Sequence, residues 1–152
     1  TYPINFTDLR NRKNNQPNGD SKAMTDTPKP TGELTLRTLA MPADANPAGD
    51  IFGGWVMSQM DLASGIRAAE RARCRVVTAS VKEMAFELPV KIGDTLSIYT
   101  DIVRVGRTSI TLSIEAWAHR SRYNKLEKVT AATFIMVALD DDGQPTPVPA
   151  EA

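Results

Sequence analysis

The chain has 152 residues, 41% of them hydrophobic, which suits one globular domain with a core of its own. Its 18 basic and 18 acidic residues give a formal net charge of zero, so the overall field favours neither nucleic acid nor a membrane as a partner. One cysteine and one histidine exclude an intramolecular disulfide, a multi-cysteine metal site and a histidine-rich zinc site, and we expect no bound metal.

Residues 1–30 are expected to form a disordered or extended arm, because they carry four prolines and hardly any apolar periodicity. A single domain is expected over residues 31–152. Met24 would serve as a natural start, in which case part of the 23 residues before it would not belong to the native protein. The sequence has no apolar run of about 18 residues and no signal-like start, so we expect a cytoplasmic protein.

The domain begins with a predicted strand, loop and helix. The strand covers residues 33–40, the loop residues 42–52 and the helix about residues 53–72. Apolar residues occupy most of the helix circumference, so we expect it to be enclosed on most sides. Asp61 would then be at least partly buried, and a buried carboxylate is a better candidate for function than an exposed one.

Four strand patterns follow the helix. In residues 77–88 the apolar parity changes, which predicts a bulge or bend near Lys82 and Glu83. The next strand runs to Val105, where Gly106 and Arg107 are expected to form a two-residue hairpin turn. Two further strands end at residues 120 and 139, the last apolar on both faces. We expect these four strands to form an antiparallel meander and, with the first strand, a five-stranded antiparallel sheet wrapped around the one long helix. This is an α+β arrangement, the shape of a hotdog fold.

A glycine pair stands at the predicted start of the helix, and a carboxylate follows two turns later. Unpaired N–H groups at Gly53 and Gly54 could polarise a carbonyl oxygen. Gly54 and Asp61 are seven residues apart and fall nearly on one helix face. This pattern is compatible with an acyl-thioester site, whereas the alternative is a tight loop followed by a surface aspartate.

Other polar residues have structural alternatives. Asn46, which precedes a proline in a glycine-containing loop, could close a turn through its side chain. Asp50 is a candidate helix cap. His119 lies on the polar side of an alternating strand, so we expect a surface histidine rather than a partner for a nucleophile.

Residues 36–46 and 49–61 resemble the YciA-type hotdog acyl-CoA thioesterases. The similarity continues through residues 75–81, Phe86, residues 89–94 and residues 105–109, and covers about residues 33–149 in total. The resemblance implies a homodimer, commonly assembled as a hexameric trimer of dimers, with active sites between protomers. It also implies hydrolysis of acyl-CoA to a free acid and CoA without a metal or other cofactor.

The resemblance also implies roles for individual residues. Asp61 matches the catalytic aspartate, acting as general base or nucleophile, and Asn46 matches an asparagine supplied by the other subunit. The Gly54 amide would bind the thioester oxygen, as oxyanion holes do. Contacts to CoA are implied for Gly53, Val77, Thr78, Ala79, Arg107, Thr108 and Ser109.

Several alternatives remain open at this level. Thr78 and Ala79 could serve only strand pairing, and Arg107 could be a solvated turn residue. A phosphate-binding basic neighbourhood is predicted from adjacent loops that carry Arg104, Arg107, Arg120, Arg122 and Lys125. The rival functions are a noncatalytic acyl-CoA-binding sensor and, less favoured, a hotdog dehydratase, which would need a histidine with a carboxylate.

Overall fold

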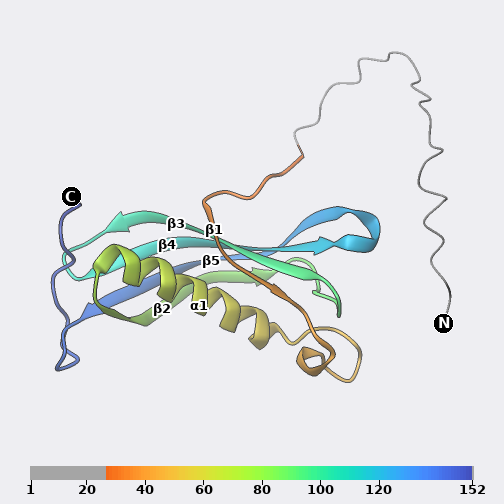
Figure 1. The fold of residues 1–152 in the computed structure, drawn as a ribbon, viewed down its shortest axis with the longest axis horizontal. Coiled ribbons are helices and arrows are strands. Elements are labelled where there is room, and N and C mark those ends of the chain that lie inside the picture. The colour runs from red at the N-terminus through yellow and green to blue at the C-terminus, as the bar shows by residue number, and fades with distance from the viewer. Residues whose placement is uncertain (1–26, 152) are drawn as a thin grey trace, which may run out of the picture.

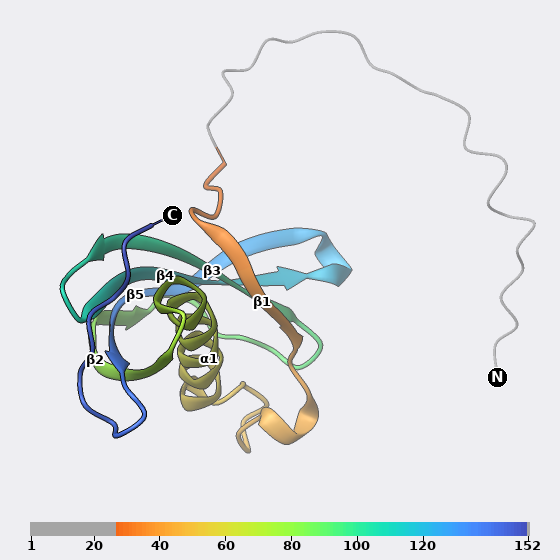
Figure 2. The same ribbon diagram turned by 60° about the vertical axis from the view of Figure 1, so that its left-hand side comes forward.

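A computed structural model describes residues 27–151 of the protein. One long helix lies against a single antiparallel sheet that curves around it (Figures 1 and 2). The elements are β1 (Glu33–Leu39), α1 (Gly53–Ala72), β2 (Arg75–Phe86), β3 (Thr95–Val105), β4 (Ser109–Arg120) and β5 (Lys125–Leu139), with short 3-10 turns at Pro42–Asp44 and Ser121–Tyr123. This confirms the predicted order of elements and the hotdog arrangement. Most of the predicted arm lies outside the described residues, and the domain boundary at residue 31 stays a prediction.

The pairing of the strands differs from the expected meander. The strand order is β1-β3-β4-β5-β2, so only β3, β4 and β5 follow one another as neighbours, and the prediction of a four-stranded meander was wrong. Arg73 adopts φ 55° after the helix and turns the chain directly into β2 at one edge of the sheet. The following link then passes the start of α1, where the Ile51 N–H bonds to the Val90 carbonyl over 2.9 Å. It therefore delivers β3 to the far side of the sheet.

Irregularities in the strands lie near the predicted positions. The register between β2 and β5 shifts between Lys82 and Ala85, with Glu83 at φ 60°, which confirms the predicted bulge. A second shift, between Thr78 and Ser80, was not predicted. The β3–β4 turn is one residue later than predicted, because the Gly106 N–H bonds to the Ser109 carbonyl over 2.7 Å. Its two central residues are therefore Arg107 and Thr108.

The helix buries one face and leaves the other open. Val56, Met60, Ala63, Ala68 and Ala72 are buried between α1 and the sheet. On the opposite side Leu62 and Ile66 are 55% and 44% exposed, Met57 near the start of the helix is 42% exposed, and Asp61 is exposed as well. The expectation of an enclosed helix with a partly buried Asp61 was therefore wrong for a single chain, because one sheet layer covers only one side of a helix. Within residues 27–151 no helix is long and apolar enough to cross a membrane.

Candidate active site

Asp61 and Thr78 form the polar contact at the centre of the candidate site. Asp61 lies in the third turn of α1, and the Thr78 hydroxyl on β2 donates a hydrogen bond to its Oδ1. Thr78 is directly opposite Met136, a buried residue, so its side chain points to the helix side of the sheet. The contact fixes the orientation of the carboxylate. The sequence did not predict this role for Thr78, which was assigned only to CoA binding or to strand pairing.

This pair stands at the rim of a groove of about 550 Å³ between α1 and β2. The other lining residues are mostly apolar or small: Leu62, Gly65, Ile66, Val76, Val77 and Met136. Gly65 follows Asp61 by one helical turn, and a Cβ at that position would meet no atom of the chain within 4 Å. The groove thus combines one oriented carboxylate with an apolar floor, as expected for a hydrophobic chain attached to a polar reacting group.

The first turn of α1 offers free backbone donors. The helix is capped by Phe52 without a side-chain hydrogen bond, and the first amide that bonds back to Phe52 is that of Trp55. Gly54 is exposed, and a Cβ there would meet nothing within 4 Å, so an outside oxygen could approach its N–H. The prediction that Asp50 caps the helix was wrong, because its carboxylate pairs instead with Lys91.

Asn46 closes its own loop. Its Oδ1 accepts hydrogen bonds from the N–H groups of Ala48 and Asp50, at 3.0 Å and 3.1 Å. Its backbone N–H bonds to the Asp50 carbonyl over 2.7 Å. This is the turn-closing arrangement that the sequence left open. Neither Asn46 nor Gly54 lines the groove beside Asp61 in the same chain, so the structure of one chain does not bring these three residues together.

The residues predicted to hold CoA divide between the two faces of the sheet. Val77 and Ser109 both lie opposite Val137, so these three side chains form one row on the face away from the helix. Thr78 points to the helix side, as its bond to Asp61 shows. Ala79 lies in the unpredicted bulge of β2, a strand at the edge of the sheet. A ligand that contacts both Ser109 and Asp61 would have to cross this edge.

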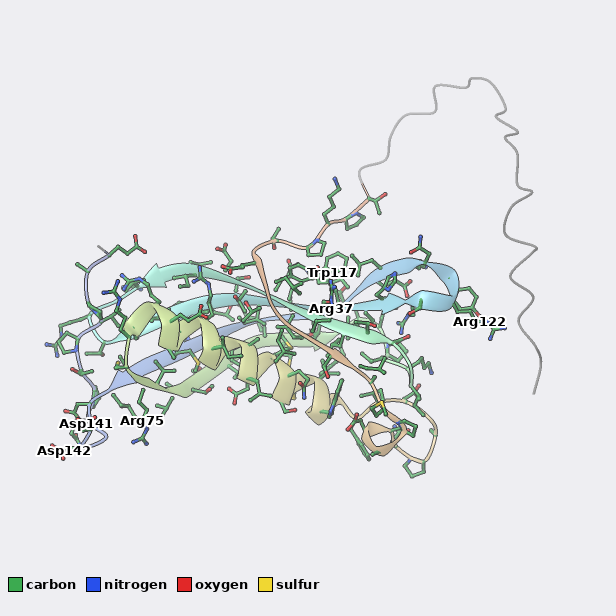
Figure 3. All side chains as sticks on the ribbon, in the orientation of Figure 1. Arg37, Arg75, Trp117, Arg122, Asp141 and Asp142 are labelled. Carbon is green, nitrogen blue, oxygen red and sulfur yellow. The ribbon has the colours of Figure 1, made fainter. Side chains whose placement is uncertain are left out.

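The predicted basic neighbourhood does not form within one chain. Arg104 and Arg107 lie beside the β3–β4 turn, whereas Arg120, Arg122 and Lys125 lie at the other end of β4. The 12 residues of β4 separate the two groups by roughly 36 Å. Figure 3 shows Arg122 at the opposite end of the molecule from Arg75, Asp141 and Asp142. Arg120 is also committed to ion pairs with Asp94 and Glu127.

The single histidine does not reach the candidate site. His119 is half-buried on the predicted polar side of β4, and its Nε2 lies 3.3 Å from Oδ1 of Asn124. Among residues 27–151 no group of three or more histidine, cysteine, aspartate or glutamate residues is arranged to hold a metal ion. The polar chemistry of the groove therefore depends on Asp61 and Thr78.

Comparison with known proteins identifies the family. A family model described as the thioesterase superfamily matches residues 48–123. The chain belongs to this superfamily. It is 50% identical over 125 residues to the acyl-CoA thioester hydrolase YciA of Salmonella typhimurium. The aligned region covers 80% of this chain and 94% of that protein. The hotdog family expected from the motif is thus confirmed.

Solved structures agree with this assignment. The hexameric thioesterase y2039 from Yersinia pestis is 48% identical, with a TM-score of 0.77 over 81% of this chain and 100% of that one. An acyl-CoA hydrolase from Staphylococcus aureus, solved with butyryl-CoA and CoA, is 30% identical, with a TM-score of 0.70 over 76% of this chain and 70% of that one. Variants of the Staphylococcus enzyme with an aspartate or an asparagine replaced by alanine have also been solved.

Proposed function

We propose that this thioesterase-superfamily member hydrolyses acyl-CoA thioesters to a free carboxylic acid and CoA. The observation that carries the proposal is the Asp61 carboxylate, held by Thr78 at the rim of an apolar groove. A thioester is already an activated acyl group, so an oriented carboxylate, a water molecule and an oxyanion hole are sufficient for its hydrolysis. No histidine relay is needed.

Asp61 has two chemically complete roles. As general base it takes a proton from water while the water oxygen adds to the thioester carbonyl; the C–S bond then breaks, and the CoA thiolate leaves and is protonated. As nucleophile its own oxygen adds to the carbonyl, the C–S bond breaks and the CoA thiolate leaves and is protonated, and water hydrolyses the resulting anhydride to the free acid and the Asp61 carboxylate. In either case the hydrogen bond from Thr78 holds one carboxylate oxygen and directs the other toward the substrate.

The candidate residues of one chain do not meet at one groove. Gly54 and Asp61 are seven residues apart on one helix, so their backbones are separated by about 10 Å along its axis. An oxyanion donor must lie about 3 Å from the carbonyl oxygen that it stabilises, but neither Gly54 nor Asn46 lines the groove beside Asp61 in the same chain. We therefore assign Asp61 of one protomer to work with Gly54 and Asn46 of another.

The surface of the single chain supports such an assembly. Leu62 and Ile66 form an exposed apolar surface at the groove, and exposed apolar surfaces of this kind mark association sites. The adjacent strand β2 is an unpaired edge, which a second copy can extend. We propose a homodimer as the smallest active unit and, as in the Yersinia relative, a hexamer.

The Staphylococcus aureus relative supports the choice of residues. The asparagine and the aspartate replaced by alanine in its solved variants are separated by the same fifteen positions as Asn46 and Asp61. Hydrolysis without a cofactor other than the CoA of the substrate, and a cytoplasmic location, stay predictions from the sequence.

A noncatalytic acyl-CoA sensor and a dehydratase are the alternatives. The dehydratase is disfavoured because His119 bonds to Asn124 on β4 and does not line the groove. A sensor would keep the CoA contacts but would not need an oriented carboxylate. The contact between Thr78 and Asp61 therefore favours an enzyme.

Release of free thiol from acyl-CoAs of increasing chain length tests the proposal. The wild type should turn over at least one of them, and Asp61→Asn should lower kcat by about 100-fold to 10,000-fold, the usual contribution of a positioned acid or base. Asp141→Asn is the matched control, because Asp141 is an exposed residue that does not line the groove. If the wild type binds acyl-CoA but releases no thiol, the protein is a sensor and the proposal fails.

A further inference from the structure

The end of the chain folds back onto the β3–β4 turn. After β5 the Asp140 carboxylate accepts hydrogen bonds from the N–H groups of Asp142 and Gln144, at 3.0 Å and 2.8 Å, which reverses the chain. The Thr146 N–H then bonds to the Ala138 carbonyl over 2.9 Å. We refer to residues 144–151 as the C-terminal strap.

The strap and β5 together fix the peptide groups of the turn. The Val148 N–H bonds to the Arg107 carbonyl over 2.8 Å, and the Ala138 N–H bonds to the Thr108 carbonyl over 2.9 Å. Both carbonyls belong to the central residues of the turn, which the hairpin itself leaves without partners. Val148 also packs against the hydrophobic core. The strap thus holds the Arg107 carbonyl and β5 holds the Thr108 carbonyl, so both central peptide groups of the turn are fixed.

Arg71 fastens the strap to the helix. It lies in the last turn of α1, its side chain is only 14% exposed, and its Nη1 donates to the Pro149 carbonyl over 2.7 Å. Its Nε lies 3.4 Å from the Glu151 carboxylate. A cation at this end of a helix is also favoured by the dipole. One arginine therefore links the helix that carries Asp61 to the strap that holds the turn.

We propose that Arg71 and the C-terminal strap position the Arg107–Thr108–Ser109 turn for binding the CoA part of the substrate. The inference rests on the proposed function, in which this turn contacts CoA. Asp61 lies about 15 Å along the helix axis from Arg71, and no strap residue lines the groove. Loss of the strap contacts should therefore weaken the capture of acyl-CoA and leave the chemical step unchanged.

Two variants of the full-length enzyme remove the contacts separately. Arg71→Met keeps the apolar stem and removes the donors to Pro149 and Glu151. Val148→Pro removes the single N–H that bonds to Arg107 and keeps an apolar side chain. Each should raise KM for acyl-CoA by about tenfold, the factor expected for one hydrogen bond, with kcat within about twofold of the wild type. Arg71→Lys, which retains a cationic donor, should recover part of the loss.

The controls separate this inference from the proposed function. Arg122→Met, at the far end of the sheet, should leave KM and kcat unchanged. Arg107→Ala should raise KM; if it does not, the turn does not bind CoA and the site assignment fails. If Arg107→Ala raises KM but Arg71→Met and Val148→Pro do not, or if these two lower kcat at constant KM, the positioning role is overturned. Thermal unfolding of each variant identifies any that fail to fold.

Discussion

Replacing Thr78 by valine tests the contact on which the proposed chemistry depends. Valine has nearly the shape of threonine and is equally suited to a strand, so the change removes the hydroxyl that donates to Asp61 and little else. The sequence motif alone assigns Thr78 to CoA binding. The structure instead makes it the residue that orients the carboxylate, and the two roles predict different kinetic changes.

The expected magnitude follows from the type of bond. A hydrogen bond to a charged group contributes about 1.5–3 kcal/mol, which corresponds to about 10-fold to 100-fold in rate if it is fully expressed in the transition state. Asp61 and Thr78 are both exposed in the single chain, and water competes for such a bond. We therefore expect the lower part of this range, a decrease in kcat of about tenfold to thirtyfold with little change in KM.

Steady-state thiol release by Thr78→Val and Thr78→Ser is the assay. Serine retains the hydroxyl, so Thr78→Ser should keep most of the wild-type kcat. An increase in KM at unchanged kcat for the valine variant would show that Thr78 serves CoA, as the motif suggested. Equal losses in both variants would show that the methyl group matters rather than the hydrogen bond. Either result would refute the role derived from the structure.

Three further predictions concern the stability of the scaffold. Arg120→Met should destabilise the protein by about 3–5 kcal/mol, because it leaves the buried Asp94 carboxylate without its ion-pair partner; a change in the unfolding midpoint that amounts to less than about 1 kcal/mol would contradict this. Gly32→Ala should lower Tm, because Gly32 has φ +89° and a Cβ there would lie 2.5 Å from the Thr100 carbonyl oxygen. Gly49→Ala is the control for the steric contribution to this loss, because Gly49 also has a positive φ but a Cβ there would meet no atom within 4 Å. Burial alone would raise the pKa of Glu115, but hydrogen bonds from Trp117 and Thr31 and the charge of Lys128 more than offset this and hold the pKa below its usual value. The carboxylate therefore adds stability above pH about 4.3, and this stability is lost as the pH falls through its lower folded pKa. Between about pH 6 and pH 3, Tm should therefore fall less steeply for Glu115→Gln than for the wild type. Parallel curves of Tm against pH for the two proteins would contradict this assignment.

Local pattern was sufficient for the secondary structure of this chain. The helix begins at Gly53 and ends at Ala72 as predicted, because the glycine pair and the long apolar periodicity are properties of adjacent residues. The bulge near Glu83 was visible as a change of parity within one strand. The motif at residues 49–61 also indicated the family, because it preserves the order and spacing of residues around one helix start.

The environment of the candidate site could not be read from the same pattern. The apolar residues of α1 suggested an enclosed helix with a partly buried Asp61, yet one sheet layer covers only one face and Asp61 is exposed in the single chain. The predicted basic neighbourhood failed because successive turns of a hairpin lie at opposite ends of its strands. In both cases composition was known, but the distance between segments was not.

The sequence by itself thus determined the helix, the strands and the identity of the candidate residues, since each depends on neighbours within a few positions. Only the tertiary structure decided which of those residues meet. Thr78 reaches Asp61 across 17 positions, and Val148 reaches Arg107 across a larger separation, because β2 pairs with β5 and the chain end returns to the turn. Strand pairing depends on the summed contacts of segments far apart in the chain, which no local periodicity records.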